Sequence, residues 1–164
     1  MDGTFTTLTP SDTTPPLRSN GASTGTLPAG TRQATLSLMT NEAAVCKYGL
    51  TPGTSYEALP NLFTTTGGTS HAVTVTGLID GGLYAYGVRC QDTAGNANLD
   101  DFTISFSVAP DTTAPTVPAN LTATAVSPTQ VNLTWDSSTD NVAVVGYRIY
   151  RDSVQIATAT TPAY

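Results

Sequence analysis

Short runs in which apolar and polar residues alternate recur along the chain. The runs lie at residues 34–39, 44–48, 71–76, 83–90 and 102–108. Such alternation is typical of strands that turn one face to a core and the other to water. Clusters of Gly and Pro separate the runs, and this spacing of strands and turns suits a sandwich of two sheets. The pattern therefore predicts an all-β fold.

A short sequence motif that occurs twice indicates the domain organisation of the chain. Asp-Thr-Thr-Pro-Pro at residues 12–16 returns 99 residues later as Asp-Thr-Thr-Ala-Pro at 111–115. A Pro-bounded phrase repeated at the length of one small β-sandwich indicates the joints between tandem modules. We therefore predict a complete module at 11–109 and the N-terminal half of a second module at 110–164. Residues 1–10 are either the last strand of a preceding module or a tail.

The composition narrows the classes of function. Charged residues make up 11% of the chain, and the formal net charge is −6. The basic residues are scattered along the sequence and do not form the positive surface that nucleic acid requires. No apolar stretch approaches the length of a transmembrane span, and the residues after Met1 lack the order of a signal peptide. We expect no nucleic-acid partner and no membrane insertion, with any secretion signal of the parent protein lying elsewhere.

Two stretches resemble fibronectin type III domains, a family of immunoglobulin-like β-sandwiches. The first stretch combines Gly77-Leu78, Asp80-Gly81-Gly82 and Tyr84-x-Tyr86-x-Val88-x-Cys90, which resembles the turn and the penultimate strand of such a domain. This resemblance implies that the Tyr84 hydroxyl folds back onto the preceding turn. The second stretch covers 111–164 and resembles modules of bacterial chitinases and cellulases at residues 118–121, 131–135, 138–142 and 146–152.

The second resemblance implies an incomplete domain. It puts Val131, Leu133 and Trp135 on one strand face, with Trp135 in the core position of the family, and Tyr147 and Ile149 opposite. The later three strands of such a domain are missing from the sequence. Half a sandwich exposes a hydrophobic face and unpaired strand edges. We therefore expect a cover from the rest of a longer protein, from the neighbouring module or from another copy of the chain.

The chain has two cysteines, Cys46 and Cys90. An even pair in this composition suggests a disulfide and an oxidising compartment, and two buried free thiols are the alternative. In the topology that the resemblance implies, the strands at 44–48 and 83–90 are neighbours. The two cysteines could then meet across the ladder within bridging distance, so we predict a disulfide between them.

No constellation of residues indicates catalysis. His71 is the only histidine, and its sequence neighbours are mainly Thr, Ser and Gly, so we expect an exposed strand residue without a catalytic partner. We find no hydrolase, zinc-binding or phosphate-binding motif. We predict that the chain is not an enzyme, and we assign no catalytic, cofactor-binding or metal-binding residue.

Side chains with oxygen ligands gather near the second joint. Asp92, Asn96, Asp100 and Asp101 belong to one loop, and Asp111 belongs to the joint. These groups could converge on a calcium ion between modules. Their spacing matches no defined calcium loop, however, and Asp and Asn are ordinary turn formers. Both interpretations stay open.

A carbohydrate-binding surface would need exposed aromatic rings. Strand parity puts Trp135 and most tyrosines in cores, which leaves Tyr56 and Phe63 as the expected exposed pair. Residues 120–122 and 132–134 match the N-glycosylation sequence, a motif that is common by chance.

The sequence predicts a non-catalytic structural spacer in an extracellular or cell-surface multidomain protein, with adjacent modules or further copies of the same chain as partners. One hypothesis is a surface filament, in which residues 3–9 of one chain add as a strand to the open second module of the next. Residues 3–9 would supply one strand, whereas the second module lacks three. The competing hypothesis is therefore that the chain is a fragment of a longer protein. The alternative function is a carbohydrate-binding or adhesive module that accompanies a polysaccharide-degrading enzyme and has polysaccharide as its partner.

Overall fold

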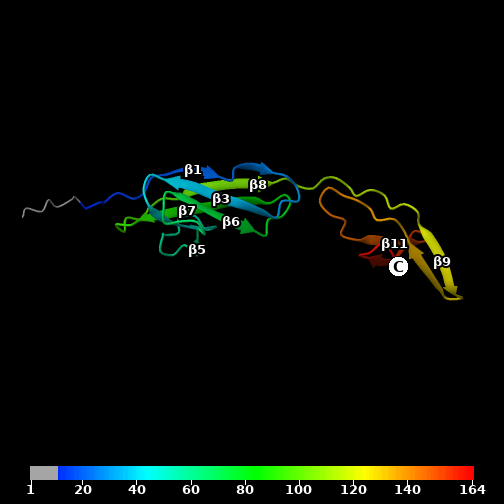
Figure 1. Cartoon of the computed structure of the whole chain (residues 1–164). Coiled ribbons are helices and arrows are strands. Elements are labelled where there is room, and N and C mark those ends of the chain that lie inside the picture. Colours follow the sequence, from blue (N-terminus) through cyan, green and yellow to red (C-terminus); the bar gives the residue numbers. More distant parts are fainter. Residues whose placement is uncertain (1–10) are drawn as a thin grey trace, which may run out of the picture. The chain divides into compact units, whose positions relative to one another are not determined.

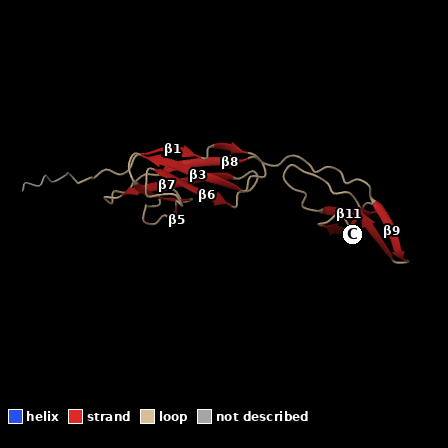
Figure 2. Ribbon diagram, viewed as in Figure 1, coloured by secondary structure: helices blue, strands red, loops and turns tan. Residues whose placement is uncertain are grey.

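The computed structural model describes residues 11–164. The chain divides into two compact units, Met1–Pro110 and Asp111–Tyr164. All regular elements of the described residues are strands (Figure 2), which confirms the all-β prediction. No helix in this part of the chain has the length and apolar character needed to cross a membrane. The predicted last strand or tail at 1–10 lies outside the described residues.

The first unit is a sandwich of two sheets (Figure 1). One sheet has the order β1-β3-β6 and the other has the order β2-β8-β7-β4-β5. The pairs are antiparallel except β2 with β8, which is parallel. The strands are β1 (Arg18–Ala22), β2 (Gly25–Leu27), β3 (Gln33–Thr40), β4 (Ala44–Gly49), β5 (Asn61–Leu62), β6 (Ser70–Thr76), β7 (Leu83–Asp92) and β8 (Phe102–Val108).

The five alternating runs of the sequence all form strands, namely β3, β4, β6, β7 and β8. The short strands β1, β2 and β5 were not predicted because their residues do not alternate. Strand β1 has the sequence Arg-Ser-Asn-Gly-Ala, and its pairing with β3 is interrupted between Ser19 and Ala22. Gly21 lies in this interruption, and a Cβ atom there would come within 2.5 Å of the Phe102 ring. Glycine is therefore required for β1 to approach the core.

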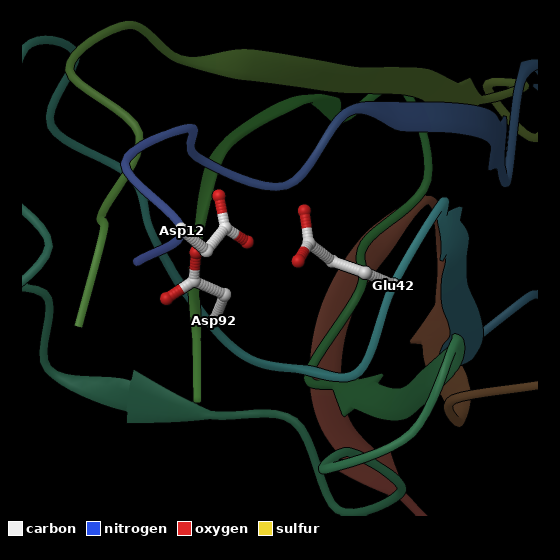
Figure 3. Close-up of side chains that lie close together, drawn as sticks. All are labelled: Asp12, Glu42 and Asp92. Atoms are coloured by element: carbon white, nitrogen blue, oxygen red, sulfur yellow. The ribbon is translucent and has the colours of Figure 1, made fainter. Parts of the chain in front are cut away.

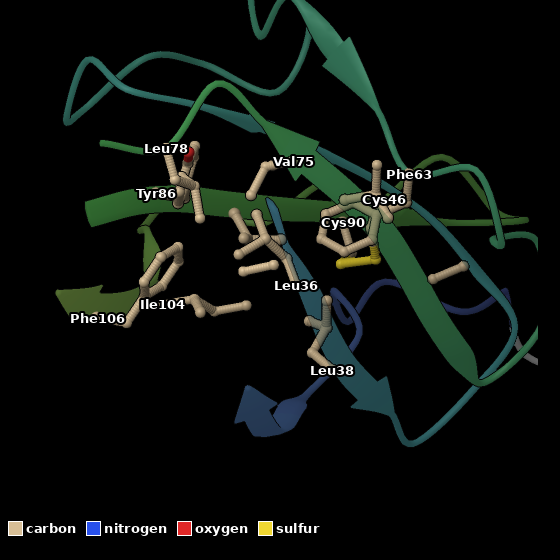
Figure 4. Close-up of a cluster of buried hydrophobic side chains, with 14 of the residues drawn as sticks. Leu36, Leu38, Cys46, Phe63, Val75, Leu78, Tyr86, Cys90, Ile104 and Phe106 are labelled. Atoms are coloured by element: carbon tan, nitrogen blue, oxygen red, sulfur yellow. A yellow bond between two sulfur atoms is a disulfide. The ribbon is translucent and has the colours of Figure 1, made fainter. Parts of the chain in front are cut away.

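Inward side chains of both sheets meet in one core (Figure 4). Its most buried aliphatic members are Leu36, Leu38, Leu78, Val88, Ile104 and Val108. Burial of each such side chain contributes about 1.5–3 kcal/mol to folding. The core also holds a disulfide between Cys46 and Cys90, which lie directly opposite each other on β4 and β7 and have no exposed surface.

The turn before β7 is fastened by the Tyr84 hydroxyl, as the family resemblance implies. This hydroxyl accepts a hydrogen bond from the N–H of Ile79 at 2.8 Å. The ring crosses over Gly82, where a Cβ atom would lie only 2.6 Å from the hydroxyl oxygen. Gly82 thus leaves the space that the folded-back ring needs.

The second unit has two antiparallel hairpins, one of β9 (Thr122–Ser127) with β10 (Gln130–Thr134) and one of β11 (Tyr147–Arg151) with β12 (Val154–Ala159). The main chain of residues 162–164 pairs with the other edge of β10. There the N–H of Leu133 donates to the oxygen of Tyr164 at 2.6 Å, and the N–H of Tyr164 donates back at 2.9 Å.

The inner face of the second unit is open. The rings of Trp135 and Tyr147 meet edge to face with centroids 5.1 Å apart. Ile149 is the one buried residue between Asp111 and Tyr164, all of which the structure describes. Val131 shares the inner face but keeps 51% of its surface exposed, because no strand of this unit covers it. That residues 110–164 are the N-terminal half of a module stays a prediction.

Candidate functional site at the N-terminal joint

Asparagine side chains hold the first Asp-Thr-Thr-Pro-Pro phrase against the first unit. The buried Asn98 donates its amide to the oxygen of Pro16 at 2.9 Å and accepts the N–H of Cys90 at 2.9 Å. Asn96 donates its amide to the oxygen of Asp12 at 3.2 Å. The joint therefore continues the module as a bonded segment.

A third asparagine holds the end of the same segment. The Oδ1 atom of Asn41 accepts the N–H of Leu17 at 2.6 Å, and the N–H of Asn41 donates to the oxygen of Leu17 at 3.2 Å. These two reciprocal hydrogen bonds connect the joint to the β3–β4 turn. None of these asparagine contacts was predicted, since they join positions far apart in the sequence.

Three carboxylates face one another at this end of the unit (Figure 3). They belong to Asp12 in the joint, Glu42 in the β3–β4 turn and Asp92 at the end of β7, and one oxygen atom of each lies within 4.8 Å of one oxygen atom of the other two. Asp12 also accepts hydrogen bonds from the N–H and the hydroxyl of Thr14, at 3.0 and 2.9 Å. Asp92 accepts the side-chain amide of Asn96 at 2.8 Å.

The three carboxylates differ in pKa. The hydrogen bonds from Thr14 hold the pKa of Asp12 below its usual value. Burial acts to raise the pKa of Asp92, but the hydrogen bonds from Asn96 and the neighbouring main chain outweigh it and the pKa is lowered. Burial, together with the charges of Asp12 and Asp92, raises the pKa of Glu42. Glu42 is therefore the member of this trio that takes up a proton first as the pH falls.

The trio can relieve its mutual repulsion in two ways. A proton can be shared between Glu42 and Asp12, or a hard cation can accept the carboxylate oxygens, which are the ligand type such cations prefer. The second unit has a different arrangement at the corresponding place. Asn141, 99 residues after Glu42, donates its amide to Asp111 at 3.4 Å, so there an amide replaces the repelling carboxylate.

Asp100 and Asp101, two of the loop carboxylates that could have converged on a cation, instead bind arginine side chains. Asp100 pairs with Arg18 at 2.7 Å, while Asp101 pairs with Arg89 at 2.7 Å. Asp101 also accepts the N–H of Gly53 at 2.6 Å, and this hydrogen bond, with that of Arg89, lowers its pKa. Both carboxylates bind cationic side chains because β1 and β7 bring arginines to the loop.

The expectation that His71 is exposed is wrong. The side chain has no exposed surface, and its ring lies between the hydroxyls of Thr40 and Thr66, each 2.9 Å from a ring nitrogen. The pattern of β6 contained the signal for this, because His71 has the same parity as the buried Val73 and Val75.

The predicted exposed aromatic pair is also wrong. Tyr56 and Phe63 keep only 7% and 1% of their surface exposed. Lys47 covers the Tyr56 ring, with its Nζ atom 4.6 Å from the centroid. The loop that contains both residues folds back on β4, so these rings offer no platform for a sugar.

Comparisons with known proteins give partial matches. No family model matches the chain. It is 35% identical to Chitinase A1 of Niallia circulans over 159 residues, which are 94% of this chain and 22% of that protein. It is 40% identical to Exoglucanase B of Cellulomonas fimi over 102 residues, which are 58% of this chain and 9% of that protein. A solved structure of chicken CNTN1 FN1-FN3 domains has a TM-score of 0.33 and 13% identity, and the match covers 90% of this chain and 58% of that chain.

The strand order of the first unit and the Tyr84 hydrogen bond agree with the family that the sequence resembles. The chain is built of fibronectin type III-like modules. In the complete module, the candidate site gathers at one end, where the joint, the β3–β4 turn and the end of β7 meet. Asp92 was a candidate from the sequence alone. Glu42 was missed.

Proposed function

We propose that the chain is a non-catalytic spacer of an extracellular polysaccharide-degrading enzyme, in which its modules hold neighbouring domains apart. The observation that supports this proposal is the hydrogen bonding of the joint, residues 12–16, to the first unit. Because Asn41, Asn96 and Asn98 bond the segment before β1 to the sandwich, the module begins with a fixed segment, as a spacer requires. The enzymes among its relatives support the setting, since the chain matches only 22% of Chitinase A1 and 9% of Exoglucanase B.

Replacement of the complete module tests the spacer role. In the enzyme that carries the chain, residues 12–110 are exchanged for a Gly/Ser linker of equal residue number, which behaves as a flexible coil. We expect unchanged turnover of a soluble oligosaccharide and slower turnover of the insoluble polymer. A loss on the soluble substrate would contradict the proposal, because it would assign the module to the chemistry.

The alternative is a carbohydrate-binding or adhesive module. In residues 11–110 every aromatic side chain is buried or half-buried, so exposed rings that could stack on a sugar lie in the second unit, at Tyr150 and Tyr164. Sedimentation of the 164-residue chain with chitin or cellulose separates the two functions. Retention above that of an inert protein of similar charge would favour the binding module, and no retention is expected of a spacer.

The filament hypothesis needs residues 3–9, which lie outside the described residues. The names of the relatives are those of enzymes and do not support assembly into a filament. The open face of the second module is compatible with strand addition. Electron microscopy of the concentrated chain tests it: ordered fibres would support assembly, while single particles would leave the spacer as the function.

A further inference from the structure

His71 connects two parts of the complete module near the N-terminal joint. Residues 63–69 cross from β5 in one sheet to β6 in the other. Their main chain reaches β3, where the N–H of Thr40 donates to the oxygen of Thr69 at 2.9 Å. The imidazole lies between the hydroxyls of Thr40 on β3 and Thr66 in the crossover. The ring therefore joins the crossover to the end of β3.

The neighbouring hydrogen bonds determine which ring nitrogen carries the proton. The Thr40 hydroxyl donates its one hydrogen to the oxygen of Glu42 at 2.6 Å, so it must accept from Nε2 of His71. The Thr66 hydroxyl accepts the N–H of Cys46 at 2.9 Å and can donate to Nδ1. The neutral Nε2–H tautomer thus satisfies every group in this chain of bonds.

A second proton on the ring would disturb this arrangement. Thr66 would have to accept from Nδ1–H and turn its own hydrogen to the oxygen of Ala44, which is 3.3 Å away. That bond is longer than the 2.9 Å bond it replaces. The resulting imidazolium would be fully buried, and a buried charge without a counter-charge is costly.

The surroundings supply no such counter-charge. Among the described residues, the side-chain partners of the ring are the hydroxyls of Thr40 and Thr66. Cys46, whose N–H bonds to Thr66, is in the disulfide. Glu42 reaches the ring only through its main-chain oxygen and Thr40, since its carboxylate lies with those of Asp12 and Asp92. Burial alone lowers the pKa of His71 from 6.5.

We propose that His71 is an acid-sensitive latch. In its neutral Nε2–H form it fastens the 63–69 crossover to β3 and the β3–β4 turn, and a second proton unfastens them. The crossover and the turn would then open locally while the other end of the module stays closed. The latch is independent of the proposed spacer function.

The direction of the pH effect follows from the two states of the ring. The opened segment exposes His71 to water and binds the proton more readily than the closed one. The latch is therefore complete above about pH 6.5 and weakens as the pH falls below it. Opening should rise about tenfold for each pH unit between the pKa of free histidine and that of the closed ring.

Nitrogen NMR on the full chain tests the ring directly. His71 is the only histidine, so its signals need no variant for assignment. We expect the proton on Nε2 at neutral pH and a titration midpoint below that of free histidine. An Nδ1–H tautomer, or a midpoint at or above the free value, would overturn the proposal.

Amide hydrogen exchange tests the opening. The protection of Gly67 and Ala44, whose N–H groups bond across the crossover, should fall between pH 7 and pH 5 after correction for intrinsic exchange. Val108 is the control, because its N–H bonds to Gly82 at the other end of the module. Equal loss at Val108 would mean global unfolding and would contradict a local latch.

Three variants separate titration from packing. His71→Gln keeps a donor and an acceptor but cannot titrate, so the pH dependence of exchange at Gly67 should vanish. Thr66→Val keeps the shape but deletes the hydroxyl, and should open the crossover already at neutral pH, while Thr66→Ser should behave as wild type. If His71→Gln fails to fold, Thr66→Ser still decides, because it keeps the hydroxyl and the histidine, and exchange at Gly67 that did not depend on pH in this variant would refute the latch.

Discussion

The two modules contain the same kind of strand but differ in how far these strands bury their side chains. In the first module, side chains from two sheets close a core around Leu36, Val88 and Ile104, which have 0–1% of their surface exposed. In the second, two hairpins are formed with equal regularity, yet Ile149 is the one buried residue. Alternation thus specifies strands, while burial depends on a facing sheet.

The sequence offers separate reporters for the two modules. Trp135 is the only tryptophan and lies in the second module, while the disulfide lies in the first. Trp135 fluorescence can therefore follow the second module. The near-ultraviolet signal of Tyr48 and Tyr86, which pack in the first module, can follow that module in the same sample.

Removal of the disulfide should have the largest effect. Cys46 and Cys90 are 44 residues apart, and a cross-link of this span contributes about 4 kcal/mol by restricting the unfolded chain. The double variant Cys46→Ala/Cys90→Ala should lose this amount in urea unfolding of the first module. The urea midpoint of the second module, followed by Trp135 fluorescence, should not change. An equal shift of that midpoint would contradict the contrast between the modules.

A matched pair of leucines tests the difference in burial. Leu36→Ala in the first module removes a side chain with 0% exposure, and Leu121→Ala in the second removes one with 68% exposure. The first should cost about 3 kcal/mol of unfolding free energy and the second less than about 0.5 kcal/mol. Comparable losses in urea titrations would show that the face of the second module is covered in solution.

Two neighbouring aspartates give a smaller test inside the first module. The side chain of Asp101 is 17% exposed and bonds to Arg89, while that of Asp100 is 81% exposed. Asp101→Asn should cost about 2 kcal/mol, because it leaves a buried arginine without its counter-charge. Asp100→Asn should cost less, because its carboxylate is exposed and Arg18 keeps hydrogen bonds to the main-chain oxygens of Val88 and Asp100. If the order of the two were reversed, the burial argument would fail.

The smallest expected effect is a loss of thermal stability of the first module at acid pH. Arg32 and the N–H of Gly30 lower the pKa of Asp80 from 3.8 to about 2. The ionised carboxylate stabilises the fold above the unfolded pKa, and this contribution is lost as the pH falls from 3.8 towards 2. Asp80→Asn should remove that part of the pH dependence of Tm, and Asp152→Asn in the second module should leave it intact.

Much of the fold could be predicted from the sequence, because local pattern determines it. Five strands followed from alternation, and the Tyr84 contact followed from the family resemblance. The joint site could not be predicted, since Asn41, Asn96 and Asn98 look like ordinary turn residues until the loops meet. His71 was misjudged for a different reason. Its parity indicated burial, but the hydroxyl of Thr40 that makes burial tolerable comes from 31 residues away.

Asn98 also determines which strand bears a mechanical force that is applied to the N-terminal end of the module. It bonds to Pro16 in the joint, and both its main chain and its side chain bond to Cys90 on β7. Strand β7 is the middle strand of the five-stranded sheet, and the disulfide anchors it to β4. Tension on the N-terminal side is therefore delivered to the centre of the sheet, where strands must slide past one another, before it can peel β1 from the edge.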